Sequence, residues 1–304
     1  MLFLDGGDVR IVPVAIRMMT MAAGAVVAAA LGVIGLSSAA PSGAATAAAT
    51  PYYLALGGSG SVGVQPTAAD PSGQPTDEGY ANDLALEARS LWPGLQLVEL
   101  GCPGETTATF ISGLDRCHKG DGSQLGDLTA FLHSHPDTAL ITVDLGFNDI
   151  RTCLRGLAVD RQCLDTALDA MKTRLEQIVH DIRSAAPRDA RIVGIGHYDP
   201  NLGRWMHSHQ SAMPSIDAFA QLNDALDAAY GAEGVPVADV SKAFDTSDSQ
   251  PSLDGSLGKL PVDVARVCAL TWECSPPPYG PNMHPNEKGY ALIARSIMDV
   301  LGSR

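Results

Sequence analysis

The chain has 304 residues, of which 45% are hydrophobic, and carries a formal net charge of −14 at pH 7. A chain this acidic is not expected to have nucleic acid or an anionic membrane surface as its main partner. Residues 46–304 are enough to build one α/β core, so we expect a single domain over that range.

The first 45 residues have the pattern of a secretory signal followed by a linker of small residues. Arg10 and Arg17 precede an apolar stretch at 18–36, and small residues that suit cleavage follow it. The stretch approaches membrane-spanning length, so an uncleaved anchor is the alternative. Its Ala- and Gly-rich composition favours cleavage, and we therefore expect a secreted protein.

Beyond the signal, apolar runs alternate with helical patterns. The predicted strands are 52–56, 95–100, 139–145, 191–195 and 235–240. Continuous apolar strands separated by helices indicate a parallel sheet that is covered on both faces.

Three amphipathic helices are predicted between and after these strands. Apolar residues at spacings of three and four predict a helix from Leu164 to Ile182. Two more are predicted at 216–230, with Ser215 as the N-cap, and at 286–301. The segments 64–79 and 241–282 lack a regular pattern, and we expect them to be loops that form the walls of a substrate pocket.

Six cysteines follow the signal, and an even number in a secreted chain indicates disulfides. Their close spacing favours pairing of nearest neighbours, which gives Cys102–Cys117, Cys153–Cys163 and Cys268–Cys274. A zinc site is disfavoured because no paired metal-ligand spacing occurs. The pairs His133/His135 and His207/His209 lack a third ligand, so we expect no metal and no cofactor.

Four short blocks contain residues suited to acyl transfer. Ser59, Gly104 and Asn148 each follow one of the first three strands, and His284 precedes the last helix. The carboxyl ends of parallel strands meet at one edge of a sheet, where ligands bind. A serine nucleophile, a histidine base and donors for an oxyanion would therefore come together there.

Two other interpretations of the first block are weaker. A nucleophile elbow, Gly-x-Ser-x-Gly, would need glycine at position 61, which is Ser61. The glycines at 58, 60 and 63 have dinucleotide-loop spacing, but a Pro- and Asp-rich stretch follows them instead of a helix.

In these four blocks and their order, the chain resembles the SGNH hydrolase superfamily, also called GDSL esterases/lipases. It looks closest to the secreted bacterial members with three disulfides. The most similar motifs are Gly146-Phe-Asn148-Asp149 and His284-Pro-Asn followed by Gly289. The resemblance implies a flavodoxin-like α/β/α sandwich with a five-stranded parallel sheet.

The resemblance also implies a role for each site residue. Ser59 would be the nucleophile and His284 the general base. The backbone amides of Ser59 and Gly104, with the side-chain amide of Asn148, would hold the oxyanion. His197, after the fourth strand, is a further candidate for the lining of the site.

The chain departs from the family pattern in two places. Gly58 stands where the family has an aspartate, and Asp144 or Asp149 could brace the turn instead. Pro281 stands where the acid of the triad is expected, three residues before the histidine. The Pro281 carbonyl is the first candidate to orient the imidazole, and Glu273 is the second.

The sequence thus predicts a secreted serine esterase or lipase that forms an acyl-enzyme. Its partner would be a small-molecule or lipid ester, with contact to a lipid surface, and the protein would be a monomer. One alternative is a degenerate hydrolase that binds a lipid or glycan without turnover. The other is an acyltransferase that uses the same site.

Overall fold

The computed structural model describes residues 50–302, except 119–121, 156–157, 207–208 and 247–259. The predicted signal and linker, His207 and the side chain of His209 lie outside the described residues. Within the described part of the chain, no helix is both long and apolar enough to cross a membrane.

The centre of the fold is a five-stranded parallel sheet in the order β2-β1-β3-β6-β7. Its strands are β1 (Tyr52–Gly57), β2 (Gln96–Glu99), β3 (Thr138–Asp144), β6 (Arg191–Ile195) and β7 (Val237–Ala238). Two short antiparallel pairs accompany the sheet: β4 (Leu154–Arg155) with β5 (Ala158–Val159), and β8 (Thr271–Trp272) with β9 (Asn282–Pro285). The predicted α/β fold with a five-stranded parallel sheet is confirmed.

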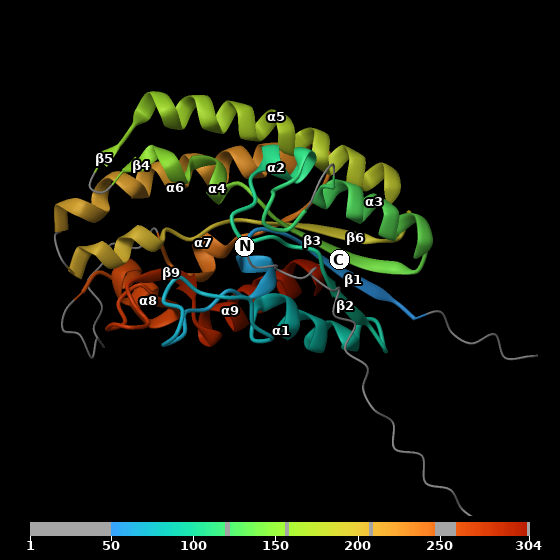
Figure 1. The fold of residues 1–304 in the computed structure, drawn as a ribbon, viewed down its shortest axis with the longest axis horizontal. Coiled ribbons are helices and arrows are strands. Elements are labelled where there is room, and N and C mark those ends of the chain that lie inside the picture. The colour runs from blue at the N-terminus through green and yellow to red at the C-terminus, as the bar shows by residue number, and fades with distance from the viewer. Residues whose placement is uncertain (1–49, 119–121, 156–157, 207–208, 247–259, 303–304) are drawn as a thin grey trace, which may run out of the picture. The chain divides into compact units, whose positions relative to one another are not determined.

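Helices cover both faces of the sheet (Figure 1). One face packs against α2 (Thr107–Ser112), α3 (Gln124–Ser134), α5 (Arg161–Ala185) and α6 (His209–Ala232). The other face packs against α1 (Tyr80–Glu87), α7 (Val240–Ala243), α8 (Val262–Leu270) and α9 (Glu287–Gly302). The remaining short helices are α4 (Phe147–Ile150), η1 (Gly60–Val62), η2 (Ala88–Ser90), η3 (Arg151–Cys153) and η4 (Pro200–Met206).

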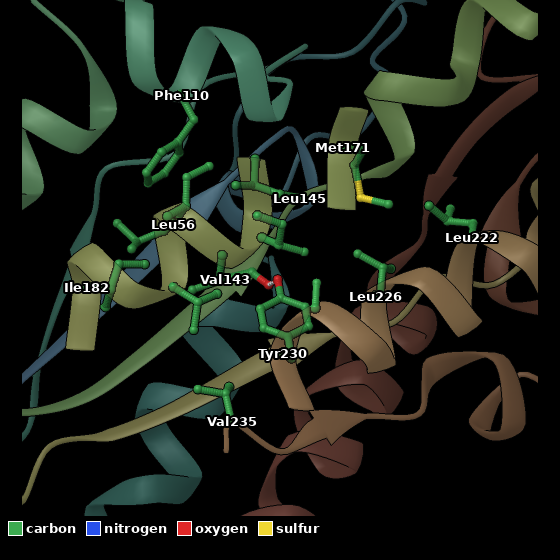
Figure 2. Close-up of a cluster of buried hydrophobic side chains, with 14 of the residues drawn as sticks. Leu56, Phe110, Val143, Leu145, Met171, Ile182, Leu222, Leu226, Tyr230 and Val235 are labelled. Atoms are coloured by element: carbon green, nitrogen blue, oxygen red, sulfur yellow. Dashed lines mark hydrogen bonds between the residues drawn. The ribbon is translucent and has the colours of Figure 1, made fainter. Parts of the chain in front are cut away.

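The inner strands β1, β3 and β6 are mostly apolar because both of their faces are buried, whereas the edge strand β2 is partly exposed. In β1, Leu54 and Leu56 point to the α5/α6 side, whereas Tyr53 and Ala55 point to the α1/α9 side. Figure 2 shows the first cluster, in which side chains from the sheet meet those of α2, α5 and α6. The Tyr230 hydroxyl, buried in this cluster, donates a hydrogen bond to the Val143 carbonyl at 2.9 Å.

Several predicted elements differ from the observed ones. The helix predicted from residue 216 begins at His209, and Ser215 does not cap it but donates a hydrogen bond to the buried Asp199 carboxylate. The last predicted strand is reduced to β7, because the Asp239 side chain accepts from the Lys242 amide and starts α7 there. The segment predicted as a loop at 241–282 contains α8 and β8.

All three predicted disulfides are present: Cys102–Cys117, Cys153–Cys163 and Cys268–Cys274. The longest closes a loop with a sequence separation of 15 residues, for which chain entropy gives about 3 kcal/mol of stabilisation. Cys102 lies two residues before Gly104, so this disulfide restrains the loop that follows β2.

Candidate active site

The predicted site residues meet in a pocket at the carboxyl ends of β1, β3 and β6, beside β9 and α9. Ser59, Asn148 and His284 all line it, and His197 lines it as well. Gly104 does not line the pocket, but its neighbour Glu105 does. No described residue of the segments 64–79 or 241–282 lines the pocket, so the prediction that these segments form its walls is wrong for those residues, while 247–259 lie outside the described part of the chain. The walls come from residues 144–148, 195–200 and 283–293.

Ser59 lies on the turn between β1 and η1, and its hydroxyl contacts the imidazole of His284. The distance between Ser59 Oγ and His284 Nε2 is 3.0 Å. The chain turns sharply before the serine: Gly57 has a φ of +124°, and a side chain there would collide with the Asp144 carbonyl. Glycine at position 57 is therefore required by both conformation and space.

A buried glutamine holds this turn from α3. The Gly57 amide donates to Gln124 Oε1 at 2.6 Å, and Gln124 Nε2 donates back to the Gly57 carbonyl at 3.1 Å. Gln124 Nε2 also donates to Glu105 Oε2 at 2.9 Å, which ties the loop after β2 to the same turn. Gln124 therefore braces the nucleophile turn in a chain that lacks the family's aspartate at position 58.

The two carboxylates expected to brace this turn have other contacts. The Gly58 amide donates to the backbone carbonyl of Asp144 at 3.0 Å, and not to its carboxylate. The Asp149 carboxylate accepts from the Thr107 amide at 3.0 Å and from the Thr107 hydroxyl at 2.6 Å, and so anchors the start of α2. Neither prediction about these side chains is correct.

His284 is oriented by Asn282, a residue that the sequence interpretation missed. The distance between His284 Nδ1 and Asn282 Oδ1 is 2.7 Å. Asn282 Nδ2 donates to the carbonyls of Pro71 at 3.0 Å and Ser72 at 3.3 Å, so its oxygen must face the imidazole. An amide oxygen only accepts, and Nδ1 therefore carries the proton and Nε2 presents its lone pair to the serine.

The two predicted candidates for this orienting role are both wrong. Among the described residues, the Pro281 carbonyl makes no hydrogen bond to His284, and Glu273 lies instead against Gly203. A signal for Asn282 was available in the sequence, since side chains two residues apart lie on the same face of a strand. Asn282 and His284 have this spacing in β9.

The surroundings of His284 keep it neutral. Burial, and to a smaller extent the nearby Arg151 guanidinium, together lower the pKa of His284 to about 4. At neutral pH the imidazole is therefore unprotonated at Nε2 and can accept the serine proton.

Amide donors lie beside the serine. Asn148 Nδ2 donates one hydrogen to the Glu105 carbonyl at 3.0 Å, which leaves its second N–H for a ligand. A side-chain carbon at Gly58 would lie 3.1 Å from Asn148 Nδ2, so the glycine gives this amide room next to Ser59. The backbone amides of Ser59 and Gly104 donate to no described residue.

Of the pair His133/His135, His135 packs within the fold and His133 is exposed. His135 stacks on Phe131 at a centroid distance of 3.9 Å and packs edge-on against Tyr52. In the described part of the chain, no group of three or more His, Cys, Asp or Glu side chains is placed to hold a metal.

A substitution at Asn282 is expected to shift the pH profile of any reaction that uses His284 as base. Asn282→Asp places a carboxylate on Nδ1, which favours the imidazolium and raises the pKa of His284 by about 1–3 units. The acid limb of the kcat/KM profile should therefore move upward from its position near pH 4. The melting temperature should fall, because the carboxylate would face the Pro71 and Ser72 carbonyls. Asn286→Asp, just before α9, is the control. An acid limb that does not move in Asn282→Asp would contradict the role of Asn282 as the residue that orients His284.

Comparison of the chain with known proteins identifies the family to which it belongs. The model of the GDSL-like lipase/acylhydrolase family matches residues 55–292. Among solved structures, the chain is similar to phospholipase A1 from Streptomyces albidoflavus, with 18% identity, a TM-score of 0.51, and 83% of this chain and 99% of that chain covered. No curated protein sequence matches the chain.

Two further lipase structures have the same fold. The extracellular lipase from Streptomyces rimosus is 17% identical, with a TM-score of 0.52 over 83% of this chain and 99% of that chain. A lipase from a goat rumen metagenome is 16% identical, with a TM-score of 0.51 over 82% of this chain and 97% of that chain. Since the family model extends from β1 into α9, the chain belongs to the GDSL-like lipase/acylhydrolase family and is, at the level of that family, an ester hydrolase.

Proposed function

We propose that this protein is a secreted serine esterase or lipase that hydrolyses carboxylic esters through an acyl-enzyme on Ser59. The observation that carries the proposal is the chain of contacts from Ser59 Oγ to His284 Nε2 at 3.0 Å and from His284 Nδ1 to Asn282 Oδ1 at 2.7 Å. A nucleophile in contact with a base that is itself oriented by a third group is the arrangement for covalent catalysis.

The acylation step follows from this geometry. His284 Nε2 takes the proton as Ser59 Oγ bonds to the ester carbonyl carbon, and the carbonyl oxygen becomes an oxyanion. The free N–H of Asn148 and the amides of Ser59 and Gly104 would donate to that oxygen. The imidazolium then gives its proton to the departing alcohol. Water, deprotonated by the same imidazole, attacks the acyl-enzyme and releases the acid and Ser59.

The neutral partner of His284 sets the expected rate. Asn282 fixes the tautomer and the ring orientation, as a triad aspartate would, but it brings no negative charge to the imidazolium that forms during the reaction. We therefore propose a slower enzyme than one with a carboxylate at this position.

The proposal also covers where the protein acts and what it binds. Three disulfides suit an oxidising compartment and support secretion of the domain. We propose a monomer that acts on a small-molecule or lipid ester, with contact to a lipid surface when the substrate is a lipid. An acyltransferase would use the same acyl-enzyme with an alcohol in place of water.

Hydrolysis of p-nitrophenyl esters of increasing acyl length tests this function. Residues 46–304, produced with the disulfides formed, should release p-nitrophenol, and Ser59→Ala should not. An added alcohol that accelerates release and yields a new ester would favour the acyltransferase. Tight binding of a lipid or glycan with no turnover of any ester would favour the binding protein.

A further inference from the structure

The pocket contains a carboxylate that its proposed chemistry does not use. Asp144 ends β3 and lines the pocket together with Ser59 and His284. Its side chain is only 12% exposed, and no described residue donates a hydrogen bond to its carboxylate. Burial raises the pKa of Asp144. A buried carboxylate without a donor is costly, so this position calls for a ligand that donates.

A histidine of the pocket wall lies beside this carboxylate and, in its neutral form, offers a second acceptor. His197 Nε2 lies 3.0 Å from the Leu145 carbonyl, which can only accept, so Nε2 carries the proton. In the neutral ring, Nδ1 is then a lone pair, and it lies 3.9 Å from Asp144 Oδ1. Two acceptors at this separation do not bond to each other. A nitrogen atom that carries at least two hydrogens can donate one to Asp144 Oδ1 and another to His197 Nδ1.

A second unpartnered polar group lies in the same wall. Tyr80 is 1% exposed and lines the pocket, and its hydroxyl lies near Thr142 but makes no hydrogen bond of normal geometry to a described residue. A side-chain carbon at Gly60 would meet both the Asp144 carboxylate and the Tyr80 ring. Glycine in the nucleophile turn therefore allows these two side chains to lie directly beneath it.

The other walls suit a cation with an apolar stem. The rings of Phe147, Tyr198 and Tyr290 line the pocket, and aromatic faces attract ammonium groups. The two tyrosine hydroxyls are occupied: Tyr198 donates to the Met283 carbonyl and Tyr290 to the Val64 carbonyl. The net charge of −14 favours the approach of cations to the protein.

From these contacts we infer that the floor of the pocket is a subsite for a primary ammonium group, bound between Asp144 and His197. The inference rests on the proposed function for its substrate class, which is an ester that carries a primary amine. An ammonium nitrogen has three N–H groups, so it satisfies both acceptors at once. A hydroxyl group has one, and leaves the other acceptor without a donor.

Binding of small amines tests the subsite without any chemistry. Propylammonium should raise the melting temperature of both the wild type and Ser59→Ala, whereas propanol at matched ionic strength should not. The effect should vanish in Asp144→Asn and persist in Asp165→Asn, which removes an exposed carboxylate from α5. Equal effects of propylammonium and propanol, or an undiminished effect in Asp144→Asn, would overturn the inference.

Paired esters test the substrate class. The wild type should prefer an amino ester to its uncharged isostere by about 10–100-fold in kcat/KM, for 2-aminoethyl acetate against propyl acetate or for methyl 3-aminopropanoate against methyl butanoate. Asp144→Asn should lose this preference. Hydrolysis of the amino ester and its uncharged isostere at equal rates would reject the ammonium subsite and leave the proposed esterase activity intact. Binding of propylammonium to both the wild type and Ser59→Ala, with no hydrolysis of any ester by the wild type, would reject the esterase and leave the subsite.

Discussion

His284→Ala is expected to lower kcat/KM for p-nitrophenyl ester hydrolysis by about 10⁴–10⁶-fold at neutral pH. Two features of the structure cause the loss. His284 Nε2 lies 3.0 Å from Ser59 Oγ, and its pKa of about 4 keeps it in the basic form. Without the imidazole, no described group contacts the serine hydroxyl to take its proton.

The control for this substitution is His180→Ala, which removes an imidazole from the exposed side of α5. It should leave kcat/KM within about twofold of the wild type, since surface changes away from the site have small effects. The melting temperatures of both variants show whether they are folded. A folded His284→Ala that keeps a tenth or more of the wild-type activity would contradict the role of His284 as base.

Asn148→Ala is expected to lower kcat by about 10²–10³-fold, because it removes one donor to the developing oxyanion. KM should change much less, since this hydrogen bond strengthens in the transition state. The variant should also lose about 1 kcal/mol of stability, because the Glu105 carbonyl loses the hydrogen bond that it accepts from Asn148.

Asn148→Asp is the matched variant for this prediction. It keeps the size of the side chain but replaces the amide donor with a carboxylate that repels the oxyanion, so its kcat should fall at least as far. Steady-state kinetics with a soluble ester measure kcat and KM separately. If both variants kept wild-type kcat while KM rose, Asn148 would contribute to substrate binding and not to the oxyanion site.

The fold could be predicted because buried strands appear in the sequence as apolar runs, and helices with one buried face appear as apolar residues at spacings of three and four. The run at 191–195 coincides with β6, and the periodic helix at 164–182 lies inside α5. The failures lie where tertiary contacts override local signals. Ser215 looked like a cap, yet the structure uses its hydroxyl for the buried Asp199.

The site could be predicted only in part, and for a related reason. Ser59, Asn148 and His284 follow strands or precede a helix in a family order, so the sequence places them at one edge of the sheet. Gln124 has no such signal, since it contacts Gly57 from 67 positions away in the chain. The family pattern points to an acid three residues before the histidine, whereas in this chain the short strand β9 places Asn282, two residues before His284, on the same face as the imidazole.

The sequence also could not predict how the side chains of the pocket wall lie relative to one another. Asp144 ends β3 and His197 lies two residues beyond the end of the neighbouring strand β6, but the separation of 3.9 Å between their side chains depends on the register of the two strands. That no described residue donates a hydrogen bond to the Asp144 carboxylate depends on how all the side chains around it pack. Such contacts become visible only when the packed structure is known.

The most direct test of the central claim is the site of reaction with a fluorophosphonate. The probe needs no knowledge of the substrate, and the adduct is located by intact mass and peptide mapping of residues 46–304. An activated nucleophile predicts one adduct, on Ser59, that is lost in both Ser59→Ala and His284→Ala. A folded, disulfide-bonded wild type that forms no adduct, or forms it on another residue, would contradict the account of Ser59 and His284 as the reacting pair.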